Sequence, residues 1–482
     1  MERPTKETKH APLCPHAKKC GGCQLTNMTY EEQLSFKQGK VIKLLGRFGH
    51  VKEILTTGQP FYYRNKVQAA FGRTRGGEII SGVYQSSTHN IVKVDSCLLE
   101  DPRADAIVVT IRKMLKEFKL TVYNENNQTG FLRHALVKAA QGTGEIMVVL
   151  VTGTKEFKSK NAFCAELRKR HPEITTIVQN VNRKFTSLVL GDEETVLYGN
   201  GYITDELLGK KFMISPKSFY QINYEATKLL YRTALDYADI KKTDRVIDAY
   251  AGVGTIGMLC SDGAREVLSV ELNADAVRDA KKNSKLNGIQ NMRFVCADAT
   301  EFITEMAQSG ETADIVIMDP PRAGSTVQFM KSVFALGPKK VVYVSCNPET
   351  LARDLDYFTR NQYKVRKIQP VDMFPNTGHV ETVVLLSKGN ISSQNVRVEF
   401  SLEDMDMSRF QQGATYEQIQ EWVQEKYGFH VTHLNIAKTK RKCGLIERQN
   451  YNLPKSEDSR SPETPKEKEE AIIEAFRHLG MI

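Results

Sequence analysis

The sequence predicts an α/β protein in which residues 216–390 form a Rossmann-like domain with a seven-stranded sheet. Between residues 245 and 390, short apolar runs alternate with helical stretches, a pattern typical of a parallel sheet covered by helices. The last two strands, predicted over Lys364–Met373 and Glu381–Leu386, are joined by a loop too short for a crossover helix. The sheet is therefore expected to end in an antiparallel pair.

Three further regions are predicted around this domain. Residues 1–60 form a cysteine-containing segment with a helix at 29–48, residues 61–215 an α+β domain, and residues 391–482 a small appended module. The α+β domain combines strand patterns with helices at 103–120 and 157–170. In the module we expect helices at 416–427 and 469–479, a basic run at 438–442 and a loosely ordered polar stretch at 456–468.

The composition suits a globular protein with an anionic partner. The chain has 482 residues, 41% of them hydrophobic, and a formal net charge of +10, which fits nucleic acid as a partner. It contains no run of about 18 apolar residues and no apolar signal segment. We therefore expect a cytoplasmic monomer without a membrane span, in which the nine cysteines do not form a disulfide framework.

Three cysteines lie close together near the N-terminus. Cys14, Cys20 and Cys23 are spaced C-x5-C-x2-C, and Cys97 supplies a possible fourth thiolate. Four thiolates suit an iron–sulfur cluster or a zinc ion. Zinc sites usually show two paired knuckles and this sequence has one, so the spacing favours the cluster. Thiols with no common ligand remain the other alternative.

A glycine-rich turn follows the first predicted strand of the Rossmann-like domain. In Val246-Ile-Asp-Ala-Tyr-Ala-Gly-Val-Gly-Thr-Ile-Gly257, the glycines allow a ligand to approach the backbone at the start of a helix. Glu271 ends the next strand, where an acid can bind the hydroxyl groups of a ribose. Enzymes that bind NAD and enzymes that bind S-adenosylmethionine (SAM) share this pattern.

Two later segments contain residues that could take part in the reaction. Asp319-Pro-Pro-Arg322 ends the fourth strand, and Cys346 follows the fifth in Ser345-Cys-Asn-Pro348. The carboxyl ends of such strands bind ligands, so Cys346 is a candidate nucleophile. A buried core thiol is the alternative, and it is the interpretation that we give to Cys164, Cys260, Cys296 and Cys443.

A thiolate is useful for methylating a pyrimidine. Attack at carbon 6 of uracil creates an enolate that is nucleophilic at carbon 5, and a base must later remove the carbon-5 proton. Glu381, which opens the last strand, is a candidate for that base. A surface carboxylate beside His379 is the alternative.

The ordered motifs resemble the RNA uracil-5-methyltransferase family, specifically its iron–sulfur branch acting on 23S ribosomal RNA. The resemblance runs from about Cys14 to Leu386 and rests on the cysteine set and on the following segments: Phe219-Tyr-Gln-Ile-Asn223, Asp248-Ala-Tyr-Ala-Gly252, Val270-Glu271, Asp319-Pro-Pro-Arg322, Ser345-Cys-Asn-Pro348 and His379-Val-Glu381. It implies a SAM-dependent enzyme that forms 5-methyluridine in RNA. Ribosomal RNA is the substrate that it favours, with transfer RNA as an alternative.

The resemblance also implies roles for single residues. Cys346 would be the nucleophile and Glu381 the proton acceptor, and a 4Fe-4S cluster would be held by the four cysteines at 14, 20, 23 and 97. The cofactor pocket would contain Gln221, Tyr250, Glu271 and Asp319. Two rival functions are a NAD-dependent oxidoreductase and a non-catalytic RNA-binding protein.

Basic residues gather on the first strand pattern of the α+β domain. Arg64, Lys66, Arg73 and Arg75 lie within twelve positions of one another. They could form a solvated sheet face or a surface that contacts phosphate. We predict that Arg64 and Lys66 contact the RNA backbone.

Overall fold

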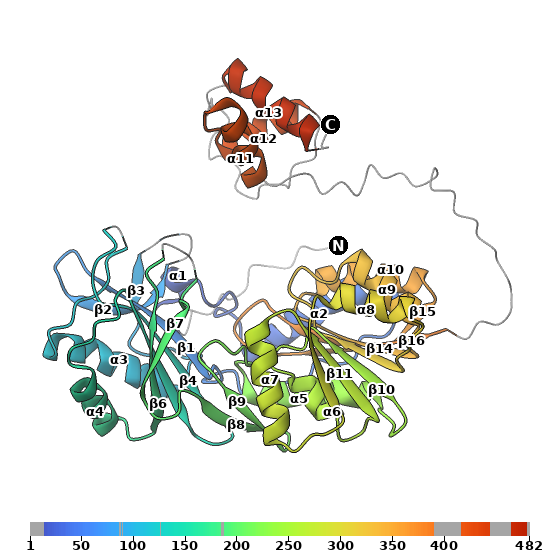
Figure 1. Cartoon of the computed structure of the whole chain (residues 1–482), viewed down its shortest axis with the longest axis horizontal. Helices are drawn as coiled ribbons and strands as arrows, with labels where there is room; N and C mark the ends of the chain where they lie inside the picture. The colour runs from blue at the N-terminus through green and yellow to red at the C-terminus, as the bar shows by residue number, and fades with distance from the viewer. Residues whose placement is uncertain are drawn as a thin grey trace, which may run out of the picture. The chain divides into compact units, whose positions relative to one another are not determined.

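The structure is a computed structural model that describes residues 14–85, 88, 90–125, 127–184, 188–389, 416–443 and 464–479. Its contacts divide the chain into two units, residues 1–390 and 391–482, each of which is described by itself. Figure 1 shows the elements along the chain. The larger unit contains two seven-stranded sheets, and the finer division at residues 60 and 215 stays a prediction.

The Rossmann-like sheet has the strand order β12-β11-β10-β13-β14-β16-β15. The pairs from β12 to β14 along this order are parallel, whereas β16 is antiparallel to both of its neighbours, β14 and β15. The predicted seven-stranded α/β sheet with a final antiparallel pair is therefore confirmed. Its strands are β10 (Arg245–Ala249), β11 (Glu266–Glu271), β12 (Met292–Cys296), β13 (Ile315–Met318), β14 (Lys340–Ser345), β15 (Tyr363–Val371) and β16 (Glu381–Lys388).

Helices cover both faces of this sheet, which explains why its central strands are continuous apolar runs. One core contains Ile303, Phe329 and Leu355 of the helices on one face, and the other contains Leu230 and Ile256. The helices are α5 (Tyr224–Ala238), α6 (Thr255–Cys260), α7 (Ala274–Leu286), α8 (Ala299–Gln308), α9 (Val327–Leu336) and α10 (Pro348–Arg360).

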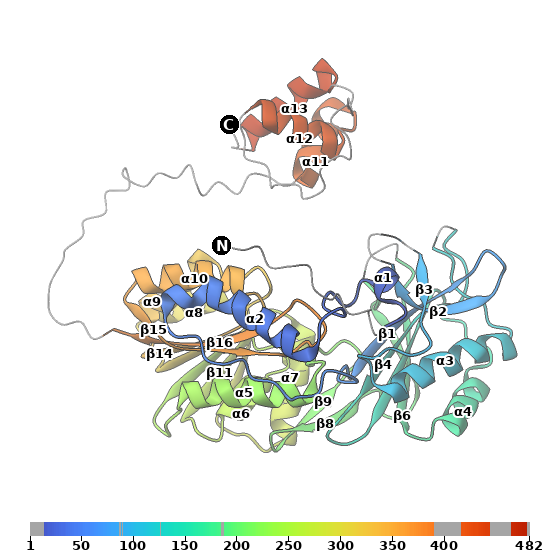
Figure 2. The ribbon, with the colours of Figure 1, turned by 180° about the vertical axis from the view of Figure 1, so that it is seen from behind.

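Helix α2 (Tyr30–Leu45) belongs to the same layers although it lies near the N-terminus. A capping box of Thr29 and Glu32 fixes its start. Its residues Val41 and Leu45 are fully buried in the core shared with α8, α9 and α10, and Figure 2 shows α2 beside α10. The segment after η1 (Gly46–Phe48) continues along the sheet edge, where Val51 pairs with Ile368 of β15.

The α+β domain holds the second sheet, in the order β3-β2-β1-β4-β5-β6-β7. Only β5 and β6 are parallel neighbours, and α4 connects them. Its elements are β1 (Lys66–Arg73), β2 (Ile79–Tyr84), β3 (Ile91–Lys93), α3 (Pro102–Glu117), β4 (Leu132–Ala139), β5 (Ile146–Thr152), α4 (Lys160–Arg170), β6 (Ile174–Val181) and β7 (Glu193–Tyr198). The sequence did not lead us to expect α1 (Ala17–Cys20) or the hairpin of β8 (Ile203–Leu207) and β9 (Lys210–Ile214).

The smaller unit contains three helices around its own core, in the residues that the structure describes. They are α11 (Tyr416–Tyr427), α12 (His433–Lys442) and α13 (Lys466–His478). Ile419, Ile436 and Phe476 are fully buried there. The predicted basic run is the second half of α12, and residues 456–463 of the predicted polar stretch lie outside the described residues.

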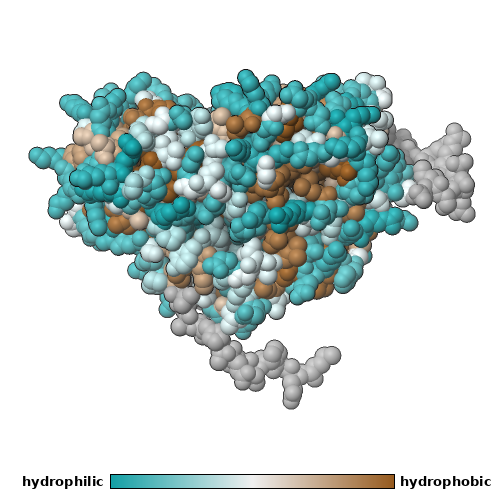
Figure 3. Space-filling view, turned by 90° about the horizontal axis from the view of Figure 1, so that it is seen from below, coloured by the Kyte–Doolittle hydropathy of each residue, from teal (hydrophilic) through white to brown (hydrophobic). Residues whose placement is uncertain are grey.

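No described helix has the length and apolar composition needed to cross a bilayer. On the face shown in Figure 3, hydrophilic residues surround smaller hydrophobic areas.

Candidate active site

A cavity of about 830 Å³ opens at the carboxyl ends of the parallel strands. The loops after β10, β11, β13 and β14 line it, together with the segment before α5 and the loop between β15 and β16. Ligands bind at this edge of α/β sheets. All six residues predicted for catalysis or cofactor binding line the cavity: Gln221, Tyr250, Glu271, Asp319, Cys346 and Glu381.

The glycine-rich turn forms one wall. Asp248, the next-to-last residue of β10, accepts a hydrogen bond from the backbone N–H of Gly257 at 2.9 Å, which fixes the start of α6. Gly257 has no room for a side chain, because a Cβ there would lie 2.5 Å from Ser269 Oγ and 2.7 Å from Asp248 Oδ2. Burial raises the pKa of Asp248 to about 7.

Glu271 and Tyr250 complete this wall. Glu271 accepts hydrogen bonds from the N–H groups of Gly252, at 2.9 Å, and Asn273, at 2.8 Å. The carboxylate therefore ties the glycine turn to the start of α7. Tyr250 adopts a left-handed backbone conformation with φ 63°, and its ring packs on Phe329 with centroids 5.2 Å apart.

Asp319 directly follows β13, the strand beside β10 in the sheet. Its pKa is raised to about 7 by burial and by the charge of Asp248. The pKa of Tyr231 is also raised, by burial and by the charge of Asp319, and Gln221 opposes this rise. Tyr231 lines the cavity but was missed in the sequence, because an aromatic residue inside an amphipathic helix resembles an ordinary core residue.

Cys346 lies at the junction of β14 and α10. Asn347 caps α10 by accepting from the N–H of Glu349 at 3.1 Å, and its Nδ2 donates to the carbonyl of Arg322 at 3.2 Å. The thiol is only partly buried and faces the cavity, so the alternative of a core thiol is wrong. Burial raises its pKa to about 11, assisted by the charges of Glu381 and Asp319 and opposed by Arg322.

Glu381 is the first residue of β16 and is 5% exposed. The alternative of a surface carboxylate beside His379 is therefore wrong. Burial and the charge of Asp319 raise its pKa to about 8, while Arg322 lowers it. A carboxyl group with such a pKa can exchange a proton near neutral pH.

Two arginines also line the cavity. Arg322 contacts the ring of His379, with Nη2 2.9 Å from Nδ1. Arg64 reaches the cavity from the α+β domain, and its Nε is buried without a hydrogen-bond partner among the described residues. Lys66, predicted together with Arg64, is exposed at the start of β1 and does not line the cavity. Phe219, by contrast, lines it and is 66% exposed.

The four cysteines of the predicted cluster are free thiols of intermediate exposure. Cys14 and Cys20 lie near enough to Cys23 to add to the rise of its pKa to about 11, which burial dominates. The N–H of Cys97 donates to Asp105 at 2.7 Å. Among the described residues, no three His, Cys, Asp or Glu side chains are arranged to hold a metal ion. The structure therefore does not support the cluster, which stays a prediction.

Of the cysteines predicted as core residues, Cys164 and Cys260 are buried as expected. Cys443 is partly buried against the core of the smaller unit. The prediction for Cys296 is wrong: this residue ends the edge strand β12 and is exposed.

Sequence comparisons identify several relatives. A family profile described as tRNA (uracil-5-)-methyltransferase matches residues 29–389. A Bacillus cereus protein described as an uncharacterized RNA methyltransferase is 41% identical over 380 residues, covering 78% of this chain and 82% of its own length. A Clostridium tetani protein with the same description is also 41% identical over 380 residues, with 78% and 82% coverage.

A solved structure is similar as well. The tRNA (uracil-54, C5)-methyltransferase of Pyrococcus abyssi in complex with S-adenosyl-L-homocysteine matches with a TM-score of 0.63 and 29% sequence identity. The match covers 76% of this chain and 85% of the other. The cysteines at positions 14, 20 and 23 and the smaller unit lie outside the residues that the family profile matches.

Proposed function

Because the chain belongs to the tRNA (uracil-5-)-methyltransferase family, we propose that it methylates carbon 5 of a uridine in RNA through a covalent adduct with Cys346. The observation that carries this proposal is that Cys346 and Glu381 line one cavity with the glycine-rich turn. A thiol, a carboxyl group with a pKa of about 8 and a cofactor wall are the parts that this reaction needs.

The cavity residues fit SAM. Its ribose can bind Glu271, and its adenine can lie beside Tyr250. Its positive sulfonium suits a wall that contains the carboxyl groups of Asp248 and Asp319, because a nearby positive charge stabilises carboxylates. Gln221, which lines the cavity together with Tyr231 and Asp319, completes the proposed pocket. When bound, SAM supplies the methyl group.

Cys346 and Glu381 carry out the other steps of the proposed reaction. The Cys346 thiolate adds to carbon 6 of the uracil, which makes carbon 5 nucleophilic. After carbon 5 has gained the methyl group, the Glu381 carboxylate removes the proton from that carbon. The electron pair of the broken C–H bond then forms the carbon 5–carbon 6 double bond, and the Cys346 thiolate leaves.

The target base must leave its stack to reach Cys346. Phe219 offers an exposed aromatic face at the cavity, and Arg64 offers to a phosphate or base oxygen an Nε that has no hydrogen-bond partner in the described part of the chain. We propose ribosomal RNA as the first substrate to test, because the motif set favours that branch. Transfer RNA is the second candidate, because the family description and the Pyrococcus abyssi enzyme name it.

The cysteine set remains part of the proposal on spacing alone. Cys14, Cys20 and Cys23 occupy one short segment, and Gly22 fits tightly there, since a Cβ would lie 3.3 Å from Cys20 Sγ. We assign no step of the reaction to a cluster. The NAD-dependent alternative leaves Cys346 without a role and is not proposed.

The test is tritium release from RNA containing 5-tritiated uridine in the presence of SAM. We expect release that requires SAM and that disappears, by about 10⁴-fold or more, in Cys346→Ala. Retained binding of S-adenosylhomocysteine would show that the variant is folded. Methylation by Cys346→Ala at the wild-type rate would overturn the mechanism, and mapping 5-methyluridine in ribosomal and transfer RNA from a deletion strain would identify the substrate.

A further inference from the structure

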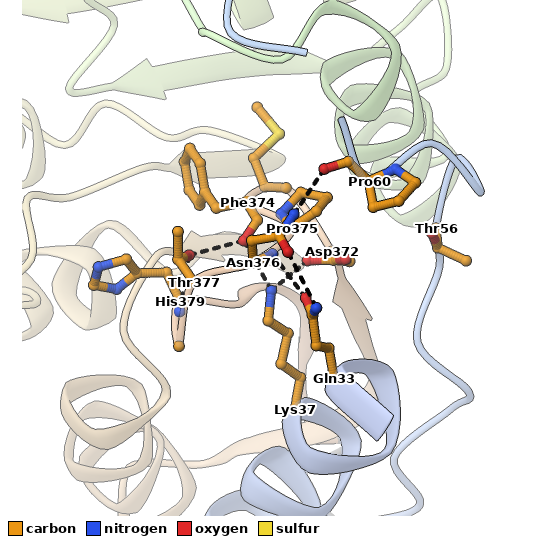
Figure 4. A network of polar contacts seen from close by, with 12 residues as sticks. Gln33, Lys37, Thr56, Pro60, Asp372, Phe374, Pro375, Asn376, Thr377 and His379 are labelled. Atoms are coloured by element: carbon orange, nitrogen blue, oxygen red, sulfur yellow. Dashed lines mark hydrogen bonds and ion pairs between the residues drawn. The ribbon is translucent and has the colours of Figure 1, made fainter. Parts of the chain in front are cut away.

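The loop between β15 and β16 has two sides with different surroundings. On one side, Phe374, Thr377, His379 and then Glu381 of β16 line the cavity. On the other side, the loop is bonded to the N-terminal part of the chain, as Figure 4 shows. The second side contains polar contacts that the proposed reaction does not use.

The central contact is a buried ion pair. Lys37 Nζ of α2 lies 2.6 Å from Asp372 Oδ1, and both side chains are 0% exposed. The same Nζ donates to the carbonyl of Phe374 at 2.9 Å. Tyr30, at the start of the same helix, donates to Asp372 Oδ2 at 2.9 Å. Lys37 therefore fixes both a side chain and a backbone carbonyl of the loop.

A second set of hydrogen bonds stabilises the backbone of Asn376, which has an uncommon conformation. Asn376 has φ 66°, in the left-handed region that non-glycine residues seldom adopt. Its N–H donates to Gln33 Oε1 at 2.8 Å, and Gln33 Nε2 donates to Asn376 Oδ1 at 3.2 Å. Asn376 Nδ2 donates to the carbonyl of Pro60 at 2.8 Å. These bonds determine the direction in which the chain continues to His379 and Glu381.

Stability alone does not explain this ion pair. Removing two charges from water costs free energy that their attraction often does not recover, so an apolar pair of similar size is often as stable. Burial lowers the pKa of Lys37 even though the charge of Asp372 opposes this. What the ion pair supplies, and an apolar pair would not, is directional hydrogen bonding to the loop.

We infer that Lys37 and Gln33 are positioning residues, which hold the loop so that Glu381 can take the carbon-5 proton. This inference rests on the proposed function, because it needs Glu381 to be the proton acceptor. The cofactor wall of the cavity, with Asp248 and Glu271, belongs to other loops, and its own hydrogen bonds join Asp248 to Gly257 and Glu271 to Gly252. Loosening the contact with α2 should therefore impair proton removal more than SAM binding.

The test uses Lys37→Met in the full-length chain. We expect kcat to fall about tenfold to hundredfold, the loss that a shift of about 1 Å of a reacting group produces, while the KM for SAM stays within about twofold of wild type. Because attack and methylation remain possible, a methylated covalent adduct of enzyme and RNA should accumulate on denaturing gels. A purely structural defect would not produce that adduct.

Three further variants make the test decisive. Lys43→Met changes an exposed lysine of the same helix and should behave as wild type. Lys37→Met/Asp372→Asn removes both charges while keeping an acceptor for Tyr30, so it remains informative if the single variant does not fold. Gln33→Leu removes the two bonds to Asn376 and should lower kcat in the same direction.

Two results would overturn the inference: wild-type kcat in a folded Lys37→Met or Lys37→Met/Asp372→Asn enzyme, or a lowered kcat without any adduct. Glu381→Gln separates this failure from failure of the proposed function. If Glu381→Gln accumulates the adduct and the Lys37 variants do not, only the positioning role is wrong. If Glu381→Gln also forms no adduct at any time, the proposed proton acceptor is wrong.

Discussion

Cys346 and Glu381 face each other at the end of an antiparallel ladder. The last pair of β14 and β16 is Ser345 with Thr382, so the next two residues in register are Cys346 and Glu381. The charge of Glu381 contributes to the raised pKa of Cys346. The two groups thus lie close enough to act on neighbouring atoms of one ring.

This relationship predicts the behaviour of Glu381→Gln. Without a carboxylate, the carbon-5 proton has no acceptor, so turnover should fall at least about 10²-fold while attack by Cys346 continues. The methylated adduct should appear as a slow band on a denaturing gel that nuclease removes. Glu305→Gln, an exposed change on α8, serves as the control and should leave no adduct. Normal turnover of Glu381→Gln would rule out this residue as the base.

The two aspartates of the cavity wall predict a pH dependence of cofactor binding. Asp248 and Asp319 have pKa values raised to about 7, so both are largely protonated at pH 6. A sulfonium beside them favours the ionised forms and lowers their pKa values, so SAM should bind more tightly as pH rises from 6 to 8, by up to about tenfold per pH unit. S-adenosylhomocysteine, which is neutral at sulfur, should bind with little pH dependence. Calorimetry on both ligands tests this, and equal pH profiles would contradict it.

The contact of Gly257 with Asp248 predicts a stability effect. In Gly257→Ala the new methyl group would overlap Ser269 and Asp248, which should cost about 1–3 kcal/mol of unfolding free energy and weaken SAM binding. Gly263→Ala is the matched control, because its Cβ would lie 3.5 Å from Ile240. Urea denaturation measures both. Equal stabilities of the two variants would show that the glycine turn can adjust.

Arg64 and Lys66 predict a salt effect on RNA binding. If each neutralises a phosphate, the Arg64→Ala/Lys66→Ala variant should bind RNA more weakly, and the slope of log K against log salt should become shallower by about 0.7–0.9 for each phosphate left without its basic side chain. Lys113→Ala/Lys116→Ala, on the exposed side of α3, also removes two positive charges and controls for net charge. Filter binding at several salt concentrations measures the slopes. An unchanged slope in the double variant would mean that neither residue binds phosphate.

The cysteine spacing predicts an oxygen-sensitive cluster on Cys14, Cys20, Cys23 and Cys97. Protein purified without oxygen should be brown and contain about four irons per chain if the cluster is cubane-type. Cys97→Ser should lower the iron content, whereas Cys164→Ser, a change in the core, should not. Iron and sulfide analysis decides the question. Stoichiometric zinc without iron would contradict the prediction.

Much of the larger unit was predictable because its elements have strong periodic patterns. The short apolar runs predicted between residues 245 and 390 are strands in the structure, and β16 starts at Glu381 as predicted, since buried strands are apolar throughout and end at polar turns. The hairpin of β8 and β9 was missed because β8, Ile-Thr-Asp-Glu-Leu207, is short and carries two acids. Helix α12 was predicted only as a basic run, because its buried positions are few.

The lining of the cavity was also predictable, because the motif residues follow strands whose carboxyl ends share one edge of the sheet. The contacts that hold the loop between β15 and β16 were not predictable. Lys37 is one of several lysines along α2 and resembles a solvated residue in the sequence, although it is fully buried. Its partner Asp372 is more than three hundred residues away, and no local pattern predicts such a pair.

The distance along the chain between Lys37 and Asp372 has a consequence for biosynthesis. Helix α2 leaves the ribosome before the strands of both seven-stranded sheets, and the loop that it holds is among the last segments of the larger unit. Contacts between such distant segments form late in folding. A nascent chain can therefore assemble most of the SAM wall before Glu381 is held in its final position. We expect enzyme that is truncated anywhere before β16 to be inactive. Activity therefore appears only once synthesis of the larger unit is complete.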